Sequence, residues 1–179
     1  MRRQAILIFL SVVCAGLVFA ADADAAKAAP IRIVAFGASE TAGYGVGSNE
    51  AWPARLEAML RAKGYDVSIA NEGVSGDTTA GMLSRLVSAV PNGTRIALLA
   101  IYYFNDWLYG VSQAQHEANV RTIIDRLHAR GIRTISVGLQ YFSGLPLQSD
   151  ELHITAEGQA TLAARLLPQV VAALGGARR

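Results

Sequence analysis

The sequence predicts an α/β domain in which a parallel β-sheet lies between two layers of helices. Four short apolar segments alternate with four helix-like segments between residues 31 and 174, and this order is typical of parallel strands joined by helical crossovers. The chain has 179 residues, of which 52% are hydrophobic and 17% are charged. It is therefore long enough and apolar enough to bury a core, and a disordered chain is excluded.

The first half of the chain is predicted to form two strands, each followed by a helix. The strands are runs of apolar and β-branched residues bounded by turn residues. Pro53 suits the first turn of the first helix and Gly64 ends it, while Asp77 is placed to cap the second helix. In chain order we expect a strand at 31–36, a helix at 51–64, a strand at 65–71 and a helix at 77–90.

The second half repeats the pattern. The segment "TRIALLAIYYF" is a long apolar run and is predicted to be a buried strand. Gly131 ends the helix that follows, and Thr155 is placed to cap the last helix. In chain order we expect a strand at 94–104, a helix at 112–131, a strand at 132–139 and a helix at 155–174.

The N-terminal segment is predicted to be a secretory signal peptide covering residues 1–25. "MRR" precedes the apolar run "QAILIFLSVVCAGLVFA", and small residues suited to cleavage follow. An uncleaved membrane anchor is the alternative, although the run is short for a membrane span. We therefore expect a short linker at 26–30, one domain at 31–179, export to the periplasm or outside the cell, and no stable membrane insertion after cleavage.

The composition excludes several classes of function. The lone cysteine, Cys14, lies in the predicted signal peptide, so the mature chain has no disulfide, no thiol chemistry and no cysteine-bound metal. The formal net charge of +2 is too small and too evenly spread to indicate nucleic-acid binding. No ligand cluster for a metal is visible, and we expect neither a metal nor another cofactor.

Residues with complementary chemistry follow the predicted strands. Ser39 follows the first strand, Gly76 follows the second within "NEGVSGDTT", and Asn105 follows the third. Asp150 and His153 stand just before the last helix. Because sites in parallel sheets form at the carboxyl ends of the strands, we expect these residues to meet at one rim.

Together these residues indicate nucleophilic catalysis. His153 can take the proton of the Ser39 hydroxyl, and Asp150 can orient the imidazole and stabilise its charged form. The backbone N–H groups of Ser39 and Gly76 and the side-chain amide of Asn105 can then form an oxyanion hole. Each residue taken alone also fits an ordinary turn. The two remaining histidines, His116 and His128, are expected on the surface of a helix away from this rim.

Four motifs in order resemble those of the SGNH (GDSL) hydrolases. They are "FGASETAGYG", "NEGVSGDTT", "FND" and "DELH". The second motif and "HITAEGQ" are most similar to the secreted lysophospholipase, thioesterase and arylesterase branch. The resemblance implies a flavodoxin-like fold, shortened here to about four strands, and the same roles for the residues: Ser39 as nucleophile, Gly76 and Asn105 as oxyanion donors, and His153 with Asp150 as base and partner.

The resemblance implies a secreted serine esterase acting on small acyl, aryl or lysophospholipid-type esters. Ala38 stands where the family usually has aspartate, Tyr103 stands where it usually has glycine, and the usual fifth strand has little room. These departures keep two alternatives open. One is a weakly active or inactive hydrolase-fold binding protein, and the other is a deacetylase of envelope carbohydrate.

Aromatic residues are expected to bind the substrate. Tyr103 and Trp107 belong to "YYFNDWLY" (102–109), which begins at the end of the third predicted strand and lies beside the site. Tyr141 and Phe142 belong to "QYFSGLPLQ" (140–148), which we expect to pack over the edge strand and form one wall of the site. If this segment does not cover the edge, a homodimer through the exposed strand is expected instead.

Overall fold

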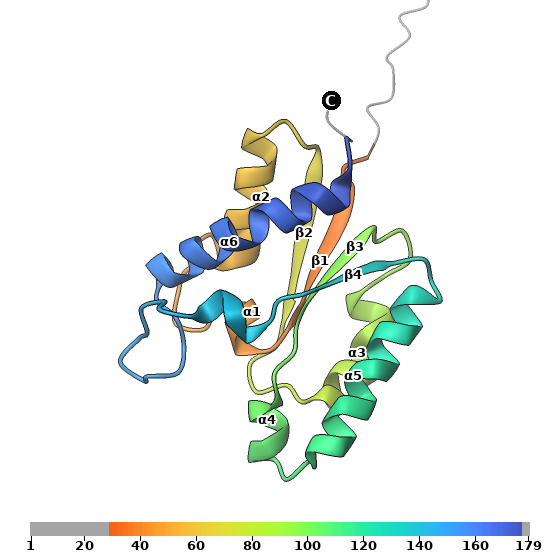
Figure 1. Ribbon diagram of the computed structural model, residues 1–179, viewed down its shortest axis with the longest axis vertical. Helices are drawn as coiled ribbons and strands as arrows, with labels where there is room; N and C mark the ends of the chain where they lie inside the picture. Colours follow the sequence, from red (N-terminus) through yellow and green to blue (C-terminus); the bar gives the residue numbers. More distant parts are fainter. Residues whose placement is uncertain (1–28, 177–179) are drawn as a thin grey trace, which may run out of the picture.

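The computed structural model describes residues 29–176 (Figure 1). The predicted signal peptide at 1–25, most of the predicted linker and the last three residues lie outside the described residues. Along the chain the elements are β1 (Ile31–Gly37), α1 (Ser39–Ala42), α2 (Trp52–Ala62), β2 (Val67–Gly73), α3 (Thr79–Ala89), β3 (Ile96–Ala100), α4 (Tyr103–Leu108), α5 (Gln113–His128), β4 (Arg133–Ser136), the 3₁₀ helix η1 (Leu139–Phe142) and α6 (Ala156–Leu174).

The four strands form one parallel sheet in the order β2-β1-β3-β4. Helices α2 and α6 cover one face of this sheet, and α3 and α5 cover the other (Figure 1). The predicted three-layer α/β/α sandwich with four strands is therefore confirmed. The order also places β4 at an edge of the sheet, as the sequence predicts.

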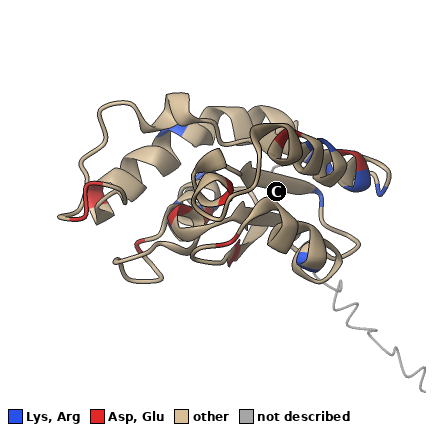
Figure 2. Cartoon of the chain, turned by 90° about the horizontal axis from the view of Figure 1, so that it is seen from below, with Lys and Arg blue, Asp and Glu red and all other residues tan. Residues whose placement is uncertain are grey.

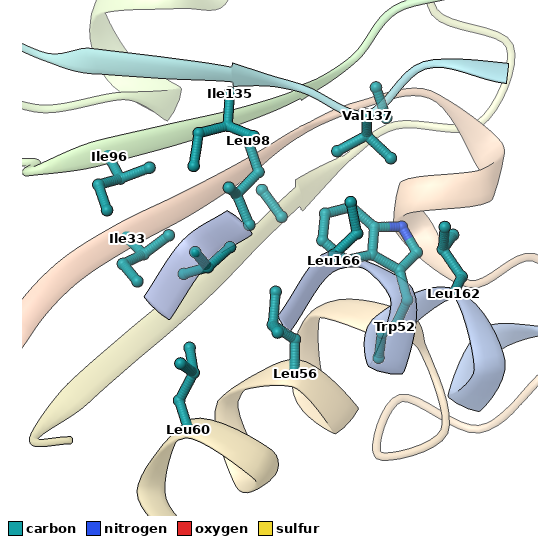
Figure 3. Close-up of a cluster of buried hydrophobic side chains, with 14 of the residues drawn as sticks. Ile33, Trp52, Leu56, Leu60, Ile96, Leu98, Ile135, Val137, Leu162 and Leu166 are labelled. Carbon is teal, nitrogen blue, oxygen red and sulfur yellow. The ribbon is translucent and has the colours of Figure 1, made fainter. Parts of the chain in front are cut away.

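Alternation along β1 supplies both cores. Ile33 and Ala35 belong to the cluster beneath α2 and α6, whereas Val34 and Phe36 belong to the cluster beneath α3 and α5. All four are completely buried, because successive side chains of a strand between two helical layers point to opposite covered faces. Figure 3 shows the first cluster, in which side chains of α2 and α6 point toward those of the strands; it includes Trp52, Leu56, Leu60, Leu162 and Leu166.

Two of the predicted helix ends, the start of α6 and the end of α2, are confirmed. Thr155 caps α6 by accepting a hydrogen bond from the N–H of Gly158, and Gly64 follows α2 with a φ of 84°. The predicted cap of α3 was wrong, because Thr78 and not Asp77 accepts the capping hydrogen bond from Gly81. The carboxylate of Asp77 is held instead by the Arg85 guanidinium at 2.7 Å.

The third predicted strand was too long. Strand β3 ends at Ala100, and the aromatic run that follows forms the short helix α4. The apolar content of this run suggested a strand, but its burial has helical spacing. Asp106 is fully buried, while Phe104, Trp107 and Leu108 are exposed. Asn105 therefore projects from a helix and not directly from a strand end.

The segment after β4 is packed, as the sequence predicts. The hydroxyl of Tyr141 donates to Gln169 at 2.6 Å, and Arg165 donates to the carbonyl oxygens of Tyr141 and Ser143. Leu145 is buried in the core beneath α6. Leu147, which we expected to help cover the edge, is half exposed. The segment thus joins the α6 layer.

Surface charges are mixed in sign. In the view of Figure 2, Lys and Arg lie among Asp and Glu and do not gather into one continuous basic face. Within residues 29–176, no helix combines the length and apolar character needed to cross a membrane.

Truncation of the central core is expected to destabilise the fold strongly. Leu98 lies on β3 and is completely buried in the core cluster that also contains side chains of α2 and α6. Leu98→Ala should lower the free energy of unfolding by about 2–5 kcal/mol, because it removes transfer energy and leaves a cavity. Urea denaturation measures this loss. Val87→Ala on α3, where the side chain is 72% exposed, should change stability by less than about 0.5 kcal/mol.

Candidate active site

A pocket of about 490 Å³ opens at the carboxyl ends of the strands. Its wall includes Ser39, Gly76, Asn105 and His153, which the sequence placed after different strands. The parallel sheet accounts for this convergence, because every strand ends at the same rim. The structure therefore brings together the predicted nucleophile, base and oxyanion donors.

Close backbone packing fixes the position of Ser39. Ser39 is the first residue of α1, which lies directly over the ends of β1 and β2. A Cβ atom on Gly73 would lie only 2.1 Å from the backbone nitrogen of Ala42, and one on Gly37 would lie 2.3 Å from Thr41 Oγ1. These glycines let α1 approach the sheet, and this approach holds Ser39 at the pocket.

Asp150 and His153 form a close pair. Nδ1 of His153 lies 2.6 Å from one carboxylate oxygen of Asp150, and the other oxygen accepts the N–H groups of Leu152 and His153. These hydrogen bonds, the one with the His153 ring first, lower the pKa of Asp150 to about 2. With Nδ1 held by Asp150, Nε2 is the nitrogen that can accept the serine proton.

A tight turn and a ring contact orient the imidazole. Glu151 adopts a left-handed φ of 56°, which lets the chain turn between Asp150 and His153. The ring of Tyr44 lies against the His153 ring with 4.4 Å between centroids. In the described residues no direct hydrogen bond joins Ser39 to His153, although both line the pocket. Such catalytic hydrogen bonds are often long before substrate binds and shorten in the complex.

The predicted oxyanion donors Gly76 and Asn105 are held by a hydrogen-bond network at the strand ends. Gly76 has a φ of 78°, a conformation that favours glycine. The amide nitrogen of Asn105 donates to the carbonyl oxygen of Asp77 at 2.9 Å, which ties α4 to the turn of Gly76. The Arg85 guanidinium joins Asp77 to the carbonyl oxygens of Glu72 and Gly37 at the ends of β2 and β1.

The expectation that His116 is a surface residue was wrong. Its side chain is only 12% exposed, and its Nδ1 lies 2.7 Å from a carboxylate oxygen of the buried Asp106. Burial raises the pKa of Asp106, but hydrogen bonds from the backbone and hydroxyl of Thr79 and from His116 outweigh it and keep the pKa below its ordinary value. This pair anchors α4 between α3 and α5. His128 is exposed, as expected.

The apolar wall of the pocket differs from the one the sequence suggested. Of the expected aromatic residues, Phe142 lines the pocket, but Tyr103, Trp107 and Tyr141 do not. Tyr103 packs against His116 and donates to the carbonyl oxygen of Val111, and Trp107 lies exposed beside Phe104. The large apolar and aromatic side chains that line the wall besides Phe142 are Tyr44, Tyr102, Phe104, Leu108, Leu139, Leu147, Leu152 and Ile154.

Two ionisable residues of the wall were missed from the sequence. Burial raises the pKa of the Glu40 carboxyl to about 7, although the hydrogen bond from the Ile154 N–H acts in the opposite direction and lowers it. Burial, and then the charge of Glu40, raises the pKa of the Tyr102 phenol above its usual range. The only signal for Glu40 in the sequence was its position directly after Ser39. The burial that raises its pKa depends on residues far along the chain, such as Ile154.

The described residues show no metal-binding cluster. Within residues 29–176, no group of three or more His, Cys, Asp or Glu side chains is arranged to hold a metal ion.

Comparison with known proteins gives relatives with esterase names. The Esterase TesA of Pseudomonas aeruginosa is 30% identical over 114 residues, which is 64% of this chain and 57% of the relative. The Arylesterase of Vibrio mimicus is 28% identical over 117 residues, which is 65% of this chain and 58% of the relative. The matched part of the chain thus spans less than two thirds of the length of these relatives.

Solved structures match over more of the chain. AlinE4, described as an SGNH-hydrolase family esterase, is 30% identical with a TM-score of 0.61, covering 82% of this chain and 98% of AlinE4. The psychrotrophic esterase EstA from Pseudoalteromonas has a TM-score of 0.71 at 18% identity, covering 82% of this chain and 100% of EstA, and supports the fold alone.

The family model agrees with the resemblance seen in the motifs. The model of the GDSL-like Lipase/Acylhydrolase family matches residues 35–177, which include Ser39, Gly76, Asn105, the Asp150–His153 pair and the last helix. The chain belongs to the GDSL-like lipase/acylhydrolase family, the SGNH hydrolases.

Proposed function

We propose that this protein is a serine esterase that hydrolyses small acyl, aryl or lysophospholipid-type esters through an acyl-enzyme. The observation that carries the proposal is one pocket lined by Ser39, Gly76, Asn105 and His153, with Asp150 bonded to the far side of the imidazole. Relatives named esterase and arylesterase support the same class of reaction.

In the first half of the proposed reaction, the Ser39 oxygen attacks the ester carbonyl carbon. Nε2 of His153 takes the hydroxyl proton, and the carboxylate of Asp150 stabilises the imidazolium. The carbonyl oxygen becomes an oxyanion that accepts hydrogen bonds from the N–H groups of Ser39 and Gly76 and from the Asn105 amide. The ester C–O bond then breaks, and the imidazolium returns its proton to the leaving alcohol.

In the second half, water replaces the alcohol. His153 takes a proton from water, and the hydroxide attacks the acyl carbon of the Ser39 ester. The same donors stabilise the second oxyanion. Breaking the acyl–Oγ bond releases the carboxylic acid, and the proton on His153 returns to Ser39.

The pocket wall supports an apolar substrate group. Tyr102 and Phe142 meet edge to face with 5.5 Å between ring centroids, and both line the pocket. Leucines from α4, η1 and the 147–152 segment extend this wall to the surface, where Leu139 is 70% exposed. Burial of apolar surface in such a pocket favours an acyl or aryl group over a free sugar.

The proposal is tested with the purified protein and a series of p-nitrophenyl esters of increasing acyl length. Hydrolysis that depends on Ser39, and a single phosphonate adduct mapped to Ser39 by mass spectrometry, are the expected results. Turnover that continues in Ser39→Ala, or an adduct on another residue, contradicts the mechanism. Absence of turnover on every ester contradicts the proposed activity.

Removal of the Asn105 amide is expected to slow the chemistry. Asn105→Ala should lower kcat by about 10²- to 10³-fold with a small change in KM, because the amide stabilises charge that exists only in the transition state. Steady-state kinetics on one p-nitrophenyl ester measures the effect. Asn92→Ala, in an exposed turn where the side chain bonds Arg130, is the matched control. A loss seen mainly in KM would place the amide in ground-state binding.

We also propose that residues 1–25 direct export, so that residues 31–179 act as one hydrolase domain in the periplasm or outside the cell. N-terminal sequencing of the secreted protein tests the cleavage. The sheet edge at β4 is the one through which a homodimer would form. Sedimentation of the mature protein distinguishes a dimer from a monomer.

A further inference from the structure

Glu40 occupies an unusual place beside the nucleophile. It follows Ser39 in α1, and among the described residues that line the pocket it is the only acidic one. Its neighbours in space come from the other end of the domain, because Ile154 and Gln159 lie more than 100 positions further along the chain.

Three hydrogen bonds join residues 40–44 to residues 148–159, the part of the chain that carries the base, and a fourth lies within the second segment. A carboxyl oxygen of Glu40 accepts a hydrogen bond from the backbone N–H of Ile154 at 3.3 Å. Ile154 is the residue that directly follows His153. The Gln159 amide donates to the Glu40 carbonyl oxygen at 3.4 Å. The Gln148 amide donates to the carbonyl oxygens of both Tyr44 and Ile154, at 2.7 and 2.9 Å. Of these links, only the first uses an ionisable side chain.

The carboxyl group of Glu40 is poorly compensated. Its second oxygen is buried and has no hydrogen-bond partner among the described residues. Burial raises the pKa of the Glu40 carboxyl group. The hydrogen bond from the Ile154 N–H and the charge of His153 lower this pKa, whereas the negative charge of Asp150 raises it further. The charge of Glu40 also reaches Tyr102: after burial, it raises the pKa of the phenol, whose hydroxyl donates to the Val137 carbonyl oxygen at 2.7 Å. His153, Asp150 and Tyr102 are thus the ionisable groups around it.

We propose that Glu40 is a positioning residue for the catalytic base: its carboxyl group fixes the His153 segment against the helix of Ser39, and its ionisation adds a second negative charge beside the imidazole. The kinetic part of this inference rests on the proposed esterase function, whereas the effect on the imidazole does not.

The electrostatic consequence is reciprocal. Because the charged forms of Glu40 and His153 attract each other, an ionised Glu40 must favour the imidazolium as much as the imidazolium favours the carboxylate. Asp150, with a pKa of about 2, stays ionised throughout the pH range in which Glu40 changes its charge, so its effect on His153 is constant there. Glu40, with a pKa of about 7, changes its charge in the same pH range as an imidazole. It can therefore tune the pH at which the base becomes available.

The first test measures the His153 imidazole by NMR titration in the wild type and in Glu40→Gln. Glutamine keeps the acceptor for the Ile154 N–H and removes the charge. The midpoint of His153 should fall by about 0.5–1 pH unit, while that of the exposed His128 stays the same. Glu117→Gln, the same change on α5 at an exposed i,i+4 pair with Arg121, is the matched control and should leave His153 unchanged. An unchanged His153 midpoint in Glu40→Gln overturns the electrostatic part.

The second test separates the hydrogen bond from the charge. Glu40→Leu removes both, so the low-field Nδ1–H signal of the His153–Asp150 bond should broaden in Glu40→Leu and persist in Glu40→Gln. In ester hydrolysis, kcat of Glu40→Leu should be about tenfold below that of Glu40→Gln, and the acid limb of kcat/KM in Glu40→Gln should move to lower pH with the NMR midpoint. A sharp Nδ1–H signal in Glu40→Leu overturns the positioning role.

The two proposals fail in different ways. A wild-type protein that hydrolyses no ester overturns the proposed function, and the NMR measurements still decide the role of Glu40. An active wild type whose His153 titration and Nδ1–H signal are indifferent to Glu40 overturns this inference and leaves the esterase function standing.

Discussion

Ser39→Ala is expected to lower kcat for ester hydrolysis by about 10⁴- to 10⁶-fold while leaving the fold intact. In the proposed mechanism the hydroxyl is the group that bonds to the acyl carbon, and Ser39 lines the pocket at the start of α1 together with His153 of the Asp150–His153 pair. His153→Ala should cost about as much, because a serine hydroxyl without a base is a weak nucleophile.

The double variant makes this prediction sharper. If Ser39 and His153 act as one unit, losing both should cost little more than losing either one. Additive losses in log kcat would show that the two residues act independently. Thermal unfolding should be similar in all three variants, and Ser88→Ala, on an exposed turn of α3, is the control for a serine that only bonds the backbone.

The positions of the strands and of the main site residues could be predicted because they depend on local patterns. Continuous apolar runs mark buried parallel strands, and parallel strands end at one rim, so Ser39 and Gly76 could be placed together from the sequence. The Asp150–His153 pair could also be predicted, since a spacing of three residues across a tight turn lets the two side chains meet.

Contacts between distant segments could not be predicted in the same way. The burial of Asp106 depends on Thr79 from α3 and His116 from α5, and no spacing in the sequence announces that these side chains meet. The apolar run 94–104 suggested a strand that continues to residue 104, although the chain turns into helix α4 at Tyr103 and buries Asp106 against Thr79. Glu40 was missed because its environment is made by Ile154.

The same reasoning explains which aromatic residues line the pocket. A list of aromatic residues near a strand end does not say which side of a helix each one occupies. Because α4 is helical, Phe104 and Leu108 lie four residues apart on the face toward the pocket, while Tyr103 turns toward His116. The substrate wall therefore follows from the helix and could not be read from composition.

Asp150→Asn is expected to lower kcat by about 10³- to 10⁴-fold, although asparagine has nearly the size and shape of aspartate. In the wild type, one carboxylate oxygen accepts the N–H groups of Leu152 and His153, and the other accepts the ring N–H of His153. An asparagine oxygen can keep the backbone bonds, so the turn should remain folded.

The expected loss of activity comes from the atom of the introduced amide that faces the His153 ring. The asparagine amide nitrogen would take the place of the carboxylate oxygen that accepts the Nδ1–H of His153. Because an amide nitrogen is a hydrogen-bond donor, it can pair only with an Nδ1 that carries no proton. The neutral ring must then carry its proton on Nε2, which leaves no lone pair to accept the Ser39 proton. Asp150→Ala should retain at least as much activity as Asp150→Asn, since alanine imposes no tautomer. Steady-state kinetics of both variants, with ¹⁵N shifts of His153 to assign its tautomer, checks the prediction, and full activity in Asp150→Asn would show that the base does not depend on this pair.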